Sequence, residues 1–144
     1  MIGNKPNNKR WKQRFENFEK ALLLLRTPFD EKALDQFSML EKEGIIQRFE
    51  FTFELVWKSL KDYLENNGII LEQITPRQTI KQAFAAKIIK DGQLWIDMLN
   101  ERNMLFHTYN ESIFATAFEN ISKKYLAELE ELFLFLKEKS LINE

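Results

Sequence analysis

Hydrophobic residues recur every three or four positions along almost the whole chain, and no segment of any length alternates between hydrophobic and polar residues. This period is that of an α-helix with one buried face, so the pattern predicts an all-α protein. Four long helices with one or two shorter ones fit an antiparallel up-and-down four-helix bundle, forming a single domain over residues 1–144. The expected helices cover residues 9–26, 30–44, 45–67, 76–89, 93 to 107 or 109, and 112–139.

Local signals suggest where these helices begin and end. Thr27-Pro28 should end the first helix, because proline disfavours helical geometry in the residue before it. Asp30 is a candidate N-cap for a short second helix that ends near Gly44. Thr75 is a candidate N-cap for the fourth helix, with Pro76 at the first helical position.

The third predicted helix, residues 45–67, carries more hydrophobic residues than one buried face needs. Phe51 and Leu55 lie off its main hydrophobic stripe, so we expect this helix to have two buried faces. In a chain of this size, the second face is a candidate dimer interface. The main stripe consists of Ile46, Phe49, Phe53, Val56, Trp57, Leu60 and Leu64.

Composition narrows the class of protein. The 144 residues are 44% hydrophobic, enough for a real core, and contain no cysteine, which excludes disulfides, a thiolate nucleophile and Cys-ligated zinc. No stretch reaches the roughly 18 apolar residues of a membrane span. The N-terminus lacks the apolar segment of a secretory signal. We therefore expect a cytoplasmic protein without contact to a membrane.

The charge is balanced overall but unevenly distributed. A net charge of −1 leaves the whole chain without an electrostatic footprint for nucleic acid. Residues 1–26 are locally basic and could meet RNA or an acidic partner, but a solvated helix face is the favoured interpretation. The basic residues of this segment are Lys5, Lys9, Arg10, Lys12, Arg14, Lys20 and Arg26.

The candidate chemistry lies in residues 102–109, with sequence RNMLFHTY, where the chain has its only histidine, His107. If the fifth helix continued through this segment, Arg102 and Tyr109 would share a face, and Asn103 would lie beside His107. His107 would still be about 140° from Arg102 around the helix. Convergence of these groups therefore requires a bend at the helix end or a second copy across a dimer.

These residue types allow a metal-independent cleavage of RNA. His107 would exchange a proton with the ribose 2′-hydroxyl, and Arg102 would stabilise charge on the phosphate. The Tyr109 phenol is an acceptor that another enzyme could modify. On spacing alone a structural alternative is favoured, because the same residues at a helix end more often form a hydrogen-bonded cluster or interact with the helix dipole. A protein without a site would bury Arg102 and His107 and satisfy them within one chain.

Three segments in order carry a family resemblance: QRFEFTFELVWK at residues 47–58, TPR at 75–77, and NERN leading into HTYNE across 100–111. With its R-x-x-x-x-H-x-Y pattern, the chain resembles the HEPN superfamily, and more narrowly its nucleotidyltransferase substrate-binding protein branch. The resemblance covers most of the length. It implies a helical bundle that dimerises and a minimal nucleotidyltransferase partner encoded nearby, in a toxin–antitoxin-like pair, with no cofactor.

The resemblance also implies roles for particular residues. Arg102 and His107 would be catalytic with support from Asn103, in an RNase site shared between two copies. Tyr109 would be the position to which the partner adds AMP. Glu101 and Arg48 are further candidate supporting residues, and RNA or a nucleotide is a candidate ligand.

Two positions depart from the family motif: Phe106 stands where relatives often have a small polar residue, and Asn110 where they often have Asp. A bulky Phe106 would either narrow the cleft or belong to the core. No metal site is expected, because a carboxylate bundle centre built on Glu50 and Glu54 would also need two Glu-x-x-His pairs. Two functions remain, a regulatory subunit and an RNase, and the near-neutral charge favours the subunit.

Overall fold

The computed structural model describes residues 6–142, with side chains from residue 10 onward, and this part of the chain is helical without a strand. The prediction of an all-α protein is confirmed there; Lys5 and the side chain of Lys9 lie outside the described part. The elements are α1 (Pro6–Glu31), the 3₁₀ turn η1 (Leu34–Gln36), α2 (Met39–Asn66), α3 (Pro76–Ala85), α4 (Gly92–His107), α5 (Glu111–Asn120), the π turn η2 (Ile121–Tyr125) and α6 (Leu126–Ile142).

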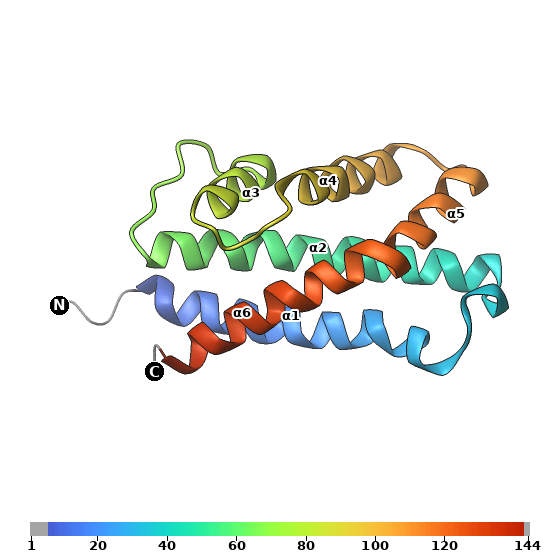
Figure 1. Ribbon diagram of the computed structural model, residues 1–144, viewed down its shortest axis with the longest axis horizontal. Helices are drawn as coiled ribbons and strands as arrows, with labels where there is room; N and C mark the ends of the chain where they lie inside the picture. The colour runs from blue at the N-terminus through green and yellow to red at the C-terminus, as the bar shows by residue number, and fades with distance from the viewer. Residues whose placement is uncertain (1–5, 143–144) are drawn as a thin grey trace.

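The long helices alternate in direction along the chain (Figure 1). Helices α1 and α2 run antiparallel side by side and form the most extensive helix pair. Helix α3 packs on α2, and α4 returns alongside α2 toward its N-terminal end. Helix α5 packs on α2, and α6 then crosses back over α1. The end of α4 therefore lies near the start of α2.

Helix α1 does not end at Thr27-Pro28 as predicted but continues to Glu31. Proline has no N–H, so Pro28 cannot bond the carbonyl of Leu24 one turn earlier. The guanidinium of Arg48 takes over this role, because its Nη1 donates to the Leu24 carbonyl at 2.6 Å. A residue from a neighbouring helix thus satisfies the carbonyl that proline leaves open, and the helix passes through.

The separate helix predicted at residues 30–44 is also wrong. Asp30 lies in the last turn of α1, and only the short η1 turn follows before α2 begins. Ser38 and Glu41 form a reciprocal capping box, in which each side chain accepts the other residue's backbone N–H. This cap starts α2 early, and the helix continues through Gly44 to Asn66.

The remaining boundaries follow the sequence more closely. Thr75 is the N-cap of α3 as predicted, and its side chain accepts from the Gln78 N–H at 3.2 Å. Helix α3 ends at Ala85 rather than near residue 89, because Lys87 adopts a left-handed φ of 63°. Its N–H bonds the Phe84 carbonyl, as at a Schellman-type helix end.

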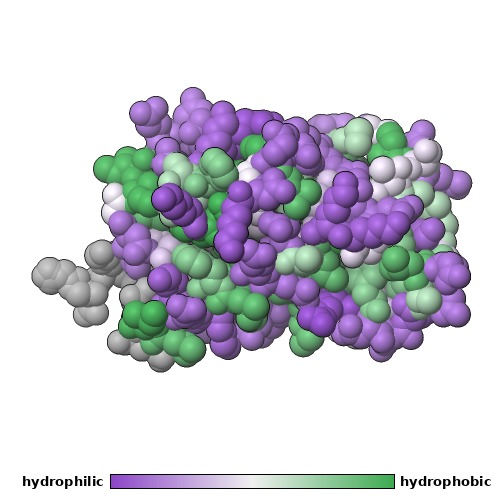
Figure 2. Space-filling model, viewed as in Figure 1, coloured by the Kyte–Doolittle hydropathy of each residue, from purple (hydrophilic) through white to green (hydrophobic). Residues whose placement is uncertain are grey.

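The predicted hydrophobic stripes form one core. All seven residues predicted on the main stripe of α2 are buried, and the tryptophans at 57 and 95 are core residues. Phe51 is 64% exposed and Phe106 is 57% exposed, so neither belongs to the core of one chain. The face seen in Figure 2 is largely hydrophilic, with separate hydrophobic patches. Within residues 6–142, no helix is both long and apolar enough to cross a bilayer.

Candidate functional site

The motif at residues 102–109 begins on α4 and ends on the link to α5. Helix α4 ends at His107, and Thr108 is extended with φ −140° and ψ 126°. Asn110 caps α5, since its Oδ1 accepts from the Ser112 and Ile113 N–H groups. The prediction that one helix places Arg102 and Tyr109 on the same face is therefore wrong. Asn and Asp cap helices equally well, so this departure from the family motif is compatible with the same cap.

Arg102 is largely buried, with only 13% of its side chain exposed. Its Nη2 forms an ion pair with Glu54 of α2, and its Nη1 donates to Asn103 Oδ1 at 3.1 Å. The guanidinium carbon lies 4.7 Å from the ring centroid of Phe106 and 5.6 Å from that of Phe53. The arginine is therefore held on the surface of α2 by charge and by two aromatic rings.

Carboxylates compensate the charge of Arg102. Glu54 contacts both Arg102 and Lys58, the latter at 3.2 Å, so its carboxylate is already occupied by cations. Burial raises the pKa of Glu50, and the nearby charge of Arg102 opposes that rise. A phosphate that binds Arg102 must therefore compete with Glu54.

His107, in contrast, is exposed. Its imidazole forms no hydrogen bond or ion pair within the described residues, and it lies in the last turn of α4, where a cation is favourable. Asn103 bonds Arg102 rather than His107. The expectation for a protein without a site is met by neither residue: His107 is exposed, and Arg102, although paired with Glu54, keeps a buried Nε without a hydrogen-bond partner among the described residues.

Tyr109 is 78% exposed, but two contacts hold its side chain in place. Its hydroxyl donates to Glu43 Oε2 at 3.1 Å, and its ring packs edge-on against Phe114 with centroids 5.3 Å apart. The hydrogen bond to Glu43 and the charge of that carboxylate raise the pKa of the Tyr109 phenol, with a smaller contribution from Glu111. Side chains from α2 and α5 thus present the tyrosine hydroxyl at a defined position.

Glu101, a candidate supporting residue, points into the protein. It is buried and accepts hydrogen bonds from the Tyr125 hydroxyl at 2.6 Å and from Asn120 Nδ2 at 2.9 Å. Asn120 and Tyr125 are five residues apart, so an α-helix would turn them about 140° away from each other. The π turn η2 lies between them and brings residues five apart toward one side. We call Glu101, Asn120 and Tyr125 the inner anchor.

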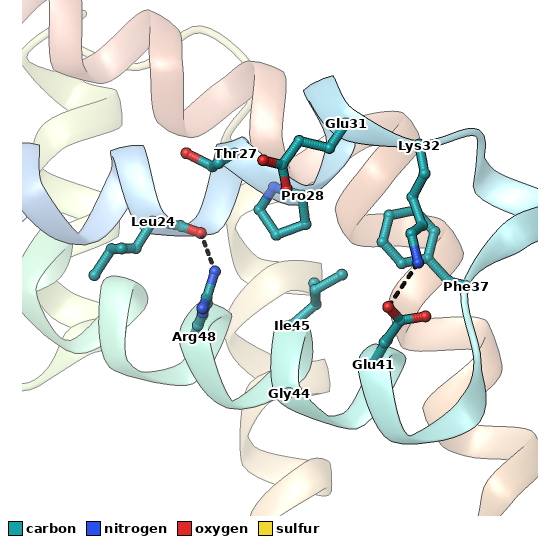
Figure 3. A pocket seen from close by; sticks show the side chains of 10 residues that line it. All are labelled: Leu24, Thr27, Pro28, Glu31, Lys32, Phe37, Glu41, Gly44, Ile45 and Arg48. Carbon is teal, nitrogen blue, oxygen red and sulfur yellow. Dashed lines mark hydrogen bonds and ion pairs between the residues drawn. The ribbon is translucent and has the colours of Figure 1, made fainter.

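Arg48, the other candidate supporting residue, faces α1 rather than the motif. It lines a hollow of about 420 Å³ between α1 and α2, where its guanidinium bonds the Leu24 carbonyl (Figure 3). Six residues separate Arg48 from Glu54, which places them about 120° apart around α2. Within one chain, the cation that contacts Glu54 besides Arg102 is therefore Lys58 and not Arg48.

Two residues that hold Tyr109, Glu43 and Phe114, were not among the candidates from the sequence. A hollow of about 370 Å³ lies beside them. The spacing of Glu43, Glu50 and Glu54 could have identified Glu43, because steps of seven and eleven residues return to the same face of a helix. The hollow is lined by Leu40, Glu43, Gly44, Ile46, Gln47, Glu50, Leu105 and Phe114.

Comparison with known proteins relates the chain to a sequence family and to a curated relative. The sequence model of the family described as "Nucleotidyltransferase substrate binding protein like" matches residues 13–138. "Probable ribonuclease HepT" of Haemophilus influenzae is 31% identical over 71 residues, which are 47% of this chain and 49% of that protein. The chain thus matches about half the length of this curated relative.

Proposed function

The chain belongs to the nucleotidyltransferase substrate-binding protein-like family of the HEPN superfamily, and from this we propose that it is the helical subunit of a two-component module. The other component is a minimal nucleotidyltransferase encoded nearby, in a toxin–antitoxin-like arrangement. The subunit docks this enzyme and presents Tyr109 as the acceptor of AMP. The observation that carries the proposal is Tyr109 itself, which is 78% exposed yet held by Glu43 and Phe114.

Apolar side chains around the tyrosine support a protein partner. Met104 is 42% exposed and Phe106 is 57% exposed, and both lie within five residues of Tyr109. Large exposed apolar and aromatic side chains mark surfaces where proteins bind each other. Phe106, which departs from the family motif, thus contributes to docking rather than to the core.

We also propose that the subunit is an antiparallel four-helix bundle that pairs with a second copy. The alternating directions of α1, α2, α4 and α5–α6 support the bundle (Figure 1). The outer face of α2 supports the pairing, because Leu40 is 79% exposed and Phe51 is 64% exposed on that face. Between them, Gly44 leaves open space into which a partner helix could pack.

A metal-independent endoribonuclease is the second candidate function. It is favoured by the exposed His107, which has no partner within the described residues, and by the name of the relative, a probable ribonuclease. The ion pair of Arg102 with Glu54 opposes it, because the arginine is not a free phosphate ligand in one chain. We therefore rank the subunit function first.

Coexpression with the neighbouring nucleotidyltransferase tests the first function. We expect a stable complex on gel filtration and an intact mass raised by one or more AMP groups. Tyr109→Phe should remove the mass increase without preventing the complex, because only the phenolic oxygen is lost. A chain that neither binds the enzyme nor gains mass would refute the subunit function.

RNA degradation in the presence of EDTA tests the second function. The unmodified chain should cleave RNA, and His107→Ala should abolish cleavage, since no other histidine can transfer the proton. Equal RNA integrity with wild type, with the variant and without protein would exclude the RNase.

A further inference from the structure

Glu43 is the one side chain that hydrogen-bonds the Tyr109 hydroxyl within the described residues. It projects from the second turn of α2, a helix whose start is fixed by the Ser38–Glu41 capping box. It is half-buried, and among the described residues its carboxylate forms a hydrogen bond with the tyrosine alone. The carboxylate is therefore positioned by the fold and available to the phenol.

We propose that Glu43 is a catalytic residue for the modification of Tyr109, and that it receives the phenolic proton when the tyrosine attacks a nucleotide. This inference rests on the proposed function, because it requires Tyr109 to be the AMP acceptor. The carboxylate oxygen 3.1 Å from the hydroxyl is within direct proton-transfer distance. With this role of Glu43, the chain would contribute to its own modification rather than serve only as a substrate.

The reaction needs one co-reactant, adenosine triphosphate, which the nucleotidyltransferase holds. The Tyr109 oxygen forms a bond to the α-phosphorus, and the bond from that phosphorus to the β-phosphate oxygen breaks. Pyrophosphate leaves with the electron pair of the broken bond. The proton of the phenol passes to Glu43 and then to water.

Electrostatics explain why a base is needed at this position. The hydrogen bond to Glu43 and the negative charge of that carboxylate raise the pKa of the Tyr109 phenol, which disfavours a free phenolate. Attack therefore proceeds from the neutral phenol, whose proton becomes acidic only as the bond to phosphorus forms. A carboxylate already accepting that hydrogen bond can take the proton without rearrangement.

Glu111 provides a matched control. It lies in the first turn of α5, is exposed, and acts on Tyr109 through its charge but without a hydrogen bond. Glu43→Gln keeps a hydrogen-bond acceptor of the same shape but cannot take a proton. Glu111→Gln removes the same unit of charge near the same tyrosine. The pair therefore separates proton transfer from the general electrostatic field.

The experiment measures single-turnover AMP transfer by intact mass, using the nucleotidyltransferase that copurifies with the wild-type chain. We expect Glu43→Gln to lower the rate at least tenfold, whereas Glu111→Gln stays within about twofold of wild type. Ultraviolet titration of Tyr109, with Tyr109→Phe as the blank, should show a lower phenol pKa in Glu43→Gln than in wild type.

Each other outcome is decisive. Equal rates for wild type and Glu43→Gln would overturn the catalytic role while leaving the proposed function intact. If Glu43→Gln transfers AMP slowly and no longer copurifies with the enzyme, Glu43 serves docking, and the catalytic role is likewise overturned. A wild-type chain that copurifies but never gains AMP would refute the AMP-acceptor function and this inference with it. A phenol pKa that is the same in Glu43→Gln and wild type would show that the Glu43 carboxylate does not act on the phenol, and would overturn the catalytic role.

Discussion

Glu101 and Arg102 are neighbours in the chain and carry opposite charges, yet their side chains serve different parts of the molecule. Glu101 turns inward and joins α4 to the π turn through Asn120 and Tyr125. Arg102 turns toward α2, where Glu54 holds it at the edge of the surface formed by residues 102–109. One helix turn thus combines a buried anchor with a surface that faces partners. The anchor fixes α4, and the surface at residues 102–109 depends on that position.

Loss of the inner anchor should have the largest effect on stability. Glu101→Ala removes the acceptor of one buried donor, Tyr125, and one partly buried donor, Asn120, so we expect the free energy of unfolding to fall by about 3 kcal/mol. Urea unfolding followed by circular dichroism measures this. Glu131→Ala on the exposed side of α6 is the control and should change stability by less than about 0.5 kcal/mol. An equally small loss for Glu101→Ala would show that the anchor is not structural.

Tyr125→Phe should have an intermediate effect. It removes one donor to Glu101 and keeps the stacked contact with Phe49, whose ring centroid is 5.7 Å away. We expect a loss of about 1.5 kcal/mol in urea unfolding. In the double variant with Glu101→Ala, the two losses should not add, because both act through one hydrogen bond. Additive losses would place Tyr125 outside the anchor.

Arg102→Ala should cost less, about 1 kcal/mol, although the residue belongs to the motif. Its ion pair with Glu54 is partly exposed, and its contacts with Phe53 and Phe106 add modest cation–π stabilisation. Thermal unfolding at low and high salt measures both parts, since only the ion pair weakens with salt. A loss as large as that of Glu101→Ala would remove the contrast between the two neighbours.

Phe106→Ser should have the smallest effect on stability, within about 0.5 kcal/mol, because the ring is exposed. The adjacent Leu105 is only 6% exposed, and Leu105→Ala is the matched control, with an expected loss of at least 2 kcal/mol. Calorimetry of both variants measures the difference. A large loss for Phe106→Ser would mean that the phenylalanine belongs to the core after all.

The hydrophobic stripes could be predicted from the sequence because burial imposes a helical period on many residues at once. Single boundaries were predicted less well, since each depends on a few contacts. Pro28 stays inside α1 because Arg48, twenty-four residues beyond Leu24, bonds the open carbonyl. No local rule at Thr27-Pro28 contains that information.

The candidate site, like the fold, could be predicted from the sequence only in part. The motif identified Arg102, His107 and Tyr109 as candidates, but left open whether the helix ends at His107, as α4 does, or at Tyr109. Nor could the inner anchor be predicted, because Asn120 and Tyr125 face Glu101 together only where the helix adopts a π turn. Side chains that meet across elements require the fold, whereas those repeated along one helix do not.

The location of the AMP group tests the central claim most directly. The chain has three tyrosines, and Tyr63 and Tyr125 are 7% and 3% exposed, whereas Tyr109 is 78% exposed. After coexpression with the nucleotidyltransferase, peptide mass spectrometry should place AMP on Tyr109 and on neither buried tyrosine. AMP on another residue, or a complex whose Tyr109 peptide is entirely unmodified, would contradict the account.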